Sequence, residues 1–165
     1  MKDSPFAIEI TPDWRGLYDC IMREGAPERV HHIELFVDWE IEEAICERYG
    51  VLEGLDREAP DFMMQRRVAV QRFLGYDYVR QGLDDLPMPL KRTTTGDTAE
   101  LARDEGRAYM EEHEGPITNW EEFEAYPWPD PEAATTHALE WYQENLPEDM
   151  CIIGSGGFAH FAEHL

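Results

Sequence analysis

The segment VHHIELFV, residues 30–37, decides the predicted fold of this chain. Most of its residues are apolar and its aliphatic side chains are largely β-branched, but apolar and polar positions do not alternate cleanly. This pattern is typical of a strand that is buried on both faces, as in a parallel sheet. Tyr76–Arg80 and Met150–Ile153 are two further short strands, and long helical stretches separate the three. Because strands joined by long helical crossovers are normally parallel, the sequence predicts an α/β fold with about three parallel strands.

Apolar periodicity and capping residues predict six to seven helices around these strands. The first begins at Thr11–Asp13 and carries an apolar stripe, expected in the core, that consists of Trp14, Leu17, Tyr18, Ile21 and Met22. Later helices are expected from Asp38 to Gly50, over Asp61–Leu74 and Thr98–Glu112, after the capping box Thr118–Glu121, from Pro131 to about Asn145, and over the last residues.

Two segments are expected to lack regular helices. Residues 84–97 contain two prolines and a threonine-rich turn, which indicates an irregular loop or hairpin. Residues 126–131 form a Pro-rich extended connector, because each proline restricts its own backbone and that of the preceding residue. Trp120, Trp128 and Trp141 are expected to anchor the packing around this connector.

The composition narrows the classes of partner. The 165 residues suit one domain or a portion of one, and 36 acidic against 14 basic residues give a formal net charge of −22. Such a charge repels phosphate backbones and anionic lipid, so we expect neither nucleic acid nor membrane as a partner. An odd number of cysteines in apolar contexts, without a signal peptide or an apolar run that could span a membrane, indicates reduced, buried thiols and a cytoplasmic protein.

Two motifs near the C-terminus can each be interpreted as a structural element or as a binding site. Gly154-x-Gly156-x-x-Ala159 follows a strand and opens a helix, as a dinucleotide fingerprint does. Because few residues follow, we favour a tight turn, with a loop that holds a substrate carboxylate as the alternative. His160–His164 has the H-x-x-E-H spacing of a zinc site, but we interpret it as the polar face of a terminal amphipathic helix.

Polar residues at the ends of predicted strands are the candidate site. Parallel α/β folds carry their chemistry at the carboxyl ends of the strands. Glu34 and Asp38 stand at this end of the first strand, where the alternatives are a functional group, a helix cap or a structural partner. The run Arg80–Asp85, which includes Gln81 and Asp84, stands at the end of the second strand and offers a guanidinium and two carboxylates, with a solvated loop as the alternative.

Four stretches carry a resemblance to a known family: PERVHHIEL at 27–35, FLGYDYV at 73–79, residues 115–132, and residues 146–165. In this order they resemble successive strands and connections of uroporphyrinogen decarboxylase-like proteins, which are TIM barrels. A closed barrel needs about 250 residues, so the resemblance implies that this chain is a partial TIM-type barrel, the N-terminal portion of the family's fold. The decarboxylase's Arg-Gln-Ala-Gly motif is replaced here by LFVD at residues 35–38.

The resemblance implies a function and a set of site residues. One branch of the family removes carboxylates from a tetrapyrrole without a cofactor, and its catalytic aspartate corresponds to Asp84. Glu34, Asp38, Arg80, Gln81, Ser155 and Gly156 are then expected to bind the substrate, with no metal. The alternatives are a methyltransferase that needs zinc and a corrinoid protein, and a non-catalytic acidic module. We expect a small-molecule substrate, and either a homo-oligomer or a missing C-terminal half to complete the barrel.

Overall fold

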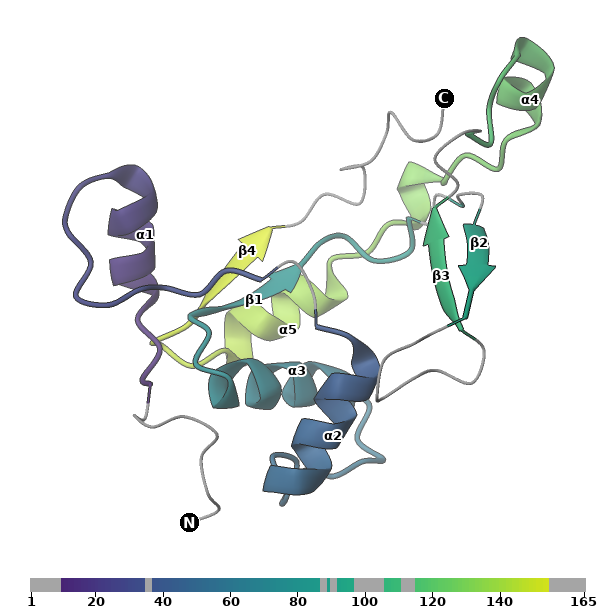
Figure 1. Cartoon of the computed structure of the whole chain (residues 1–165). Helices are drawn as coiled ribbons and strands as arrows, with labels where there is room; N and C mark the ends of the chain where they lie inside the picture. Colours follow the sequence, from purple (N-terminus) through teal and green to yellow (C-terminus); the bar gives the residue numbers. More distant parts are fainter. Residues whose placement is uncertain are drawn as a thin grey trace. The chain divides into compact units, whose positions relative to one another are not determined.

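The computed structural model describes residues 10–34, 37–86, 89, 92–96, 106–110 and 115–154. It is a mixed α/β structure with small parallel and antiparallel sheets, as Figure 1 shows. The chain divides into two compact units, Met1–Gln81 with Ala138–Gly154, and Gly82–His137 with Ser155–Leu165. No helix in the described ranges is long and apolar enough to cross a membrane.

Four of the predicted helices form in the described residues, although the last of them begins at His137 and not at Pro131. They are α1 (Trp14–Met22), α2 (Trp39–Tyr49), α3 (Phe62–Phe73) and α5 (His137–Asn145). The α1 cap is Asp13 and not Thr11, because the Asp13 carboxylate accepts a hydrogen bond from the amide of Gly16. Gly50 ends α2 in the left-handed conformation, with a φ of 60°, which glycine adopts without strain.

A two-stranded parallel sheet forms the centre of the first unit. β1 (Tyr78–Gln81) and β4 (Cys151–Gly154) pair in the register Tyr78 with Cys151 and Gln81 with Gly154, and point the same way in Figure 1. Two of the three predicted strands, and their parallel direction, are therefore confirmed. The buried core between this sheet and helices α3 and α5 includes Val79, Ala138, Tyr142 and Met150, with Met64 and Val68 packed against it.

The predicted strand Val30–Val37 is not formed in the described residues. Residues 30–34 and Val37 belong to no strand, while Leu35 and Phe36 lie outside the described ranges. The backbone groups of Glu34 bond instead to a side chain: the hydroxyl of Tyr78 accepts from the Glu34 amide at 2.9 Å and donates to its carbonyl at 3.1 Å. A hydroxyl on β1 thus satisfies groups that a strand neighbour would otherwise have paired.

A second apolar cluster joins α2 to α3. Its buried members are Cys46, Leu52 and Val70. Beside it, the buried Arg66 donates to Glu42 at 2.5 Å and to Glu43 at 2.8 Å, and its guanidinium lies 3.9 Å from the ring centroid of Trp39. Two carboxylates and an aromatic face therefore compensate the charge that α3 buries.

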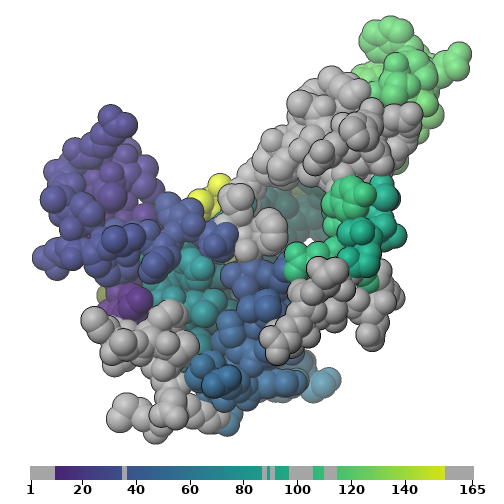
Figure 2. All heavy atoms as spheres, viewed as in Figure 1, coloured from purple at the N-terminus to yellow at the C-terminus, as the bar shows by residue number. Residues whose placement is uncertain are grey.

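The predicted apolar stripe of α1 is buried only in part. Leu17 is buried, but Tyr18, Ile21 and Met22 are exposed, and Cys20 is also exposed rather than buried. In Figure 2, the purple atoms of this helix lie open on the visible face. The helix is fixed at its first turn, where Trp14 donates its amide to the Asp149 carbonyl and its indole N–H to the Glu148 carbonyl.

The second unit contains an antiparallel hairpin where a helix was expected. β2 (Arg92–Thr95) pairs with β3 (Arg107–Met110), so the threonines expected in a turn belong to a strand, and the helix predicted over 98–112 is wrong at 107–110. Gly106 explains the difference, because its φ is 77° and a Cβ there would collide with the Thr95 carbonyl oxygen. A left-handed glycine ends a helix and suits the edge of a hairpin.

The rest of the second unit follows the predicted capping chemistry with a shift of one residue. α4 (Trp120–Ala125) is capped by Asn119, whose side chain accepts a hydrogen bond from the Glu122 amide. The Glu122 carboxylate in turn accepts a hydrogen bond from the amide of Thr118. The box is therefore Asn119–Glu122 rather than Thr118–Glu121. The connector that follows is in neither a helix nor a strand up to Asp130, and Pro131–Ala133 forms one 3₁₀ turn before α5.

Candidate functional site

The carboxyl ends of β1 and β4 lie side by side. Gln81 pairs with Gly154 at the last position of the register, so both strands leave the sheet at the same edge. Arg80 and Gln81 are two of the predicted substrate-binding residues, and the structure places both at this edge. The general rule for parallel sheets makes this edge the candidate site of the first unit.

Arg67 is a further residue at this edge that the sequence did not single out. From the exposed side of α3, its guanidinium donates to the carbonyl oxygen of Arg80 at 3.1 Å and to the side-chain oxygen of Gln81 at 3.0 Å. It therefore brings a positive charge to the exit of β1 and fixes the orientation of the Gln81 amide. Only the packing of α3 on β1 reveals this contact, because Arg67 lies in an ordinary helical sequence.

The backbone groups of Glu34 and Asp38 make hydrogen bonds in the described structure. Glu34 is exposed, and its backbone is held by the Tyr78 hydroxyl. Asp38 is the first residue before α2, where its carbonyl accepts from the amides of Ile41 and Glu42, while its side chain makes no capping bond. The helix-cap alternative thus describes the position of Asp38, although its carbonyl rather than its carboxylate makes the capping bonds.

Asp84 belongs to the second unit. Its amide and carbonyl form an isolated antiparallel bridge with Thr135, with distances of 3.1 Å and 3.2 Å between nitrogen and oxygen. Ser155 and Gly156, the remaining predicted site residues, lie outside the described residues. The same holds for the H-x-x-E-H motif at 160–164 and for all but the first glycine of the dinucleotide-type motif.

A buried carboxylate precedes β1, and the sequence did not identify it. The side chain of Asp77 is fully buried. It accepts hydrogen bonds from Arg29, from Nδ1 of His31 at 2.8 Å and from the amide of Asp13 at 2.6 Å, while its backbone carbonyl accepts from Cys151. The Asp77 carboxylate thus ties the start of α1 and the 29–31 segment to the lead-in of β1, and the Asp77 carbonyl adds a bond to β4. Its partners lie 46 to 64 residues away in the chain, which hides the cluster from local pattern reading.

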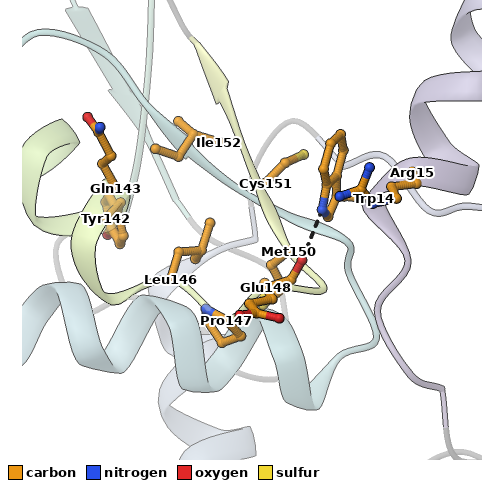
Figure 3. Close-up of a pocket in the computed structure, with 10 residues that line it drawn as sticks. All are labelled: Trp14, Arg15, Tyr142, Gln143, Leu146, Pro147, Glu148, Met150, Cys151 and Ile152. Atoms are coloured by element: carbon orange, nitrogen blue, oxygen red, sulfur yellow. Dashed lines mark hydrogen bonds between the residues drawn. The ribbon is translucent and has the colours of Figure 1, made fainter.

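An open pocket of about 600 Å³ lies at the opposite end of β4. Figure 3 shows Trp14 and Arg15 on one side of it and Tyr142 and Gln143 on the other, with Cys151 at the first position of β4. The Arg15 guanidinium lies 4.7 Å from the Trp14 ring centroid. None of the predicted site residues lines this pocket, so it is distinct from the exits of the strands.

Cys151 is the nucleophilic side chain nearest to this pocket and to Asp77, and its environment suppresses its reactivity. Burial raises the pKa of its thiol, and the negative charge of Asp77 raises it further. Burial is also the main cause of the raised pKa of Cys46, in the core between α2 and α3. A thiol with a raised pKa carries little thiolate near neutral pH, which argues against nucleophilic catalysis by either cysteine.

The difference in burial between Cys20 and the other two cysteines predicts the order in which the three thiols react. With iodoacetamide at pH 8, the exposed Cys20 is expected to be alkylated at least about tenfold faster than Cys46 or Cys151, because burial limits access to those two thiols and raises their pKa. The rate at Cys151 is expected to rise with pH to a midpoint above the ordinary thiol value of 9.0. Peptide mass spectrometry gives the three rates, and all three should become equal in denaturant. Alkylation of Cys151 as fast as Cys20 in the folded protein would contradict this assignment.

The described residues contain no group of three or more His, Cys, Asp or Glu side chains arranged to hold a metal ion. The adjacent histidines at 31 and 32 differ in surroundings, with His31 against Asp77 and His32 exposed. The zinc-dependent alternative would therefore need ligands from outside the described part of the chain.

Comparisons with protein-family models, with curated proteins and with solved structures found no match to this chain.

Proposed function

We propose that this chain is the N-terminal part of a uroporphyrinogen decarboxylase-like barrel that acts on a tetrapyrrole at the carboxyl ends of its parallel strands. The observation that carries the proposal is the parallel pairing of β1 with β4. α3 precedes β1, α5 precedes β4, and both helices pack on the same sheet. Successive parallel strands, each preceded by a helix that covers the sheet, are the repeating unit of such a barrel.

The position of the 29–34 segment supports the same arrangement. Asp77 binds Arg29 and His31, and the Tyr78 hydroxyl binds the backbone of Glu34, so this segment runs beside β1. A first barrel strand would occupy a place next to β1. In the complete barrel we expect residues 30–37 to exchange these side-chain bonds for a strand ladder, as their apolar sequence favours.

The charges at the exit of β1 favour an anionic substrate. The chain as a whole is strongly acidic, so a substrate with several carboxylates needs local cations to offset the repulsion. Arg67 reaches the exit of β1, and Arg80 is itself a residue of that strand. A guanidinium forms paired hydrogen bonds to a carboxylate, which suits the carboxylate side chains of a tetrapyrrole.

The proposed reaction replaces an acetate side chain by a methyl group. A proton adds to a ring carbon of the pyrrole and makes the ring cationic. The bond between the side-chain methylene and its carboxylate then breaks, carbon dioxide leaves, and the bonding electrons neutralise the ring. A proton added to the side chain and the loss of the ring proton complete the change. By resemblance, Asp84 accepts hydrogen bonds from the pyrrole N–H groups and stabilises the cation.

Uroporphyrin, the stable oxidised form of the substrate, tests whether the chain binds this class of ligand. Titration at physiological salt, followed by the porphyrin absorbance, is expected to give saturable binding by the wild-type chain. Arg80→Gln is expected to weaken binding about tenfold, because one hydrogen-bonded charge pair is lost. Arg48→Gln removes the same charge from the exposed last turn of α2 and should leave the affinity within about twofold. Absence of saturable binding, or an equal loss in both variants, would overturn the proposal.

A further inference from the structure

Four aromatic side chains of the second unit form a continuous series that ends at the surface. We name Trp120, Phe123, Trp128 and Tyr126 the aromatic series. The ring centroids of successive members lie 5.2 Å, 5.0 Å and 4.8 Å apart, at the tilted or edge-to-face angles that aromatic pairs prefer. The series runs from α4 into the Pro-rich connector that follows it.

The inner end of the series is fixed, and its outer end is uncovered. Tyr126 is buried, and its hydroxyl donates to the carbonyl of Pro89 at 2.8 Å. The indole N–H of Trp128 donates to the carbonyl of Phe123 at 3.0 Å, which fixes the ring. Trp120 is nevertheless 75% exposed, and Phe123 and Trp128 are also exposed. The sequence-based expectation that Trp120 anchors packing is therefore wrong, and the cost of leaving a large ring in water calls for another role.

Acidic residues are neighbours of these rings in the sequence, and no lysine or arginine lies in the segment that carries them. Glu121 and Glu124 are exposed on the same short helix, and Glu124 lies one turn after Trp120. Asp130 and Glu132 follow in the connector and the 3₁₀ turn. No lysine or arginine occurs anywhere after Arg107. An aromatic face carries a negative potential, so rings and carboxylates here attract the same kind of group.

We propose that the aromatic series is a docking surface for an arginine-bearing segment of a partner protein. A guanidinium stacks on an indole face and also pairs with a carboxylate, which matches the combination of Trp120 and Glu124. A second copy of this chain carries the same negative charge and is disfavoured, and a nucleic acid or an anionic membrane is repelled for the same reason. This surface shares no residue with the proposed tetrapyrrole site, and its test uses no tetrapyrrole.

A labelled peptide with three arginines spaced by glycine and serine is the probe. Fluorescence anisotropy at physiological salt is expected to show saturable binding to the wild-type chain. The same peptide with citrulline, which keeps the shape of arginine but has no charge, is expected to bind at least about tenfold more weakly. Equal binding of the two peptides would overturn the proposal.

Variants separate the docking surface from the general field of an acidic protein. Trp120→Ala is expected to weaken binding about tenfold, and Trp120→Phe to restore part of it. Because this ring is exposed, both variants should keep the wild-type circular dichroism spectrum. A double variant, Glu121→Gln with Glu124→Gln, should also weaken peptide binding several-fold. The control double variant, Glu47→Gln with Glu53→Gln, removes the same charge from exposed positions of the first unit and should weaken peptide binding less. Wild-type affinity in Trp120→Ala, or equal losses in the two glutamate pairs, would reject the surface.

Discussion

Replacing Asp77 by Ala is expected to lower the free energy of unfolding by about 3–5 kcal/mol, the usual cost of removing one partner from a buried ion pair. The side chain of His31 is only 3% exposed and that of Arg29 is 27% exposed, so both would lose their acceptor in surroundings that water reaches poorly. The amide of Asp13 would lose its acceptor as well. The substitution therefore loosens α1 and the 29–31 segment from the parallel sheet together.

Urea unfolding followed by circular dichroism measures this loss. Asp149→Ala is the matched control, because Asp149 also binds an arginine of the first unit, Arg72, through two bonds of 2.6 Å and 2.7 Å. These two side chains are 31% and 43% exposed, so solvent screens the pair and the expected loss is below about 1 kcal/mol. Asp77→Asn should fall between the two, since it keeps the volume and one acceptor. Losses of similar size in Asp77→Ala and Asp149→Ala would show that burial does not decide the strength of this cluster.

The elements that could be predicted from the sequence depend on local signals. α2 was predicted with its cap and its terminal glycine, because Asp38, the apolar periodicity and Gly50 are all within one helix length. β1 and β4 were predicted because each is a short apolar run followed by turn residues, and their direction follows from the helices between them. Such signals need no knowledge of distant residues.

The elements that could not be predicted depend on distant partners. Whether residues 30–34 form a strand depends on whether a neighbour offers backbone groups, and here a Tyr78 side chain 44 residues away offers a hydroxyl instead. Arg29 and His31 bind a carboxylate, Asp77, that is 48 and 46 residues away in the chain, so no local pattern shows this cluster. The hairpin strand at 107–110 was mistaken for a helix, since the left-handed conformation of Gly106 is not visible in the sequence.

The candidate site could likewise be predicted only where a local signal identifies the residue. Arg80 and Gln81 were identified by the rule that parallel strands carry their chemistry at their carboxyl ends, and this rule needs only the strand boundaries. Arg67 was missed because its place at the exit of β1 follows from the packing of α3. Asp84 was identified through the family resemblance, and the structure describes its backbone bridge to Thr135 rather than a role for its carboxylate.

The largest effect on activity is expected at Asp84. If its carboxylate stabilises the pyrrole cation, Asp84→Asn should slow the decarboxylation of uroporphyrinogen by about 10²–10³-fold, the usual loss when one preorganised group at a developing charge is removed. Chromatography of the oxidised products measures the rate, because each step yields a porphyrin with one carboxylate fewer. The variant keeps the size of the side chain and the backbone bonds to Thr135, so its unfolding curve should match that of the wild type.

Asp85 provides the control for this prediction, because it carries the same charge at the next position. Its φ is 62°, a left-handed conformation that asparagine tolerates, so Asp85→Asn should fold normally. If the local negative potential were all that mattered, both variants would slow the reaction alike. If a carboxylate at one defined position holds the pyrrole nitrogens, only Asp84→Asn loses activity. Normal rates in Asp84→Asn would remove Asp84 from the mechanism. A wild-type chain that binds uroporphyrin but releases no carbon dioxide from uroporphyrinogen would leave a tetrapyrrole-binding protein in place of a decarboxylase.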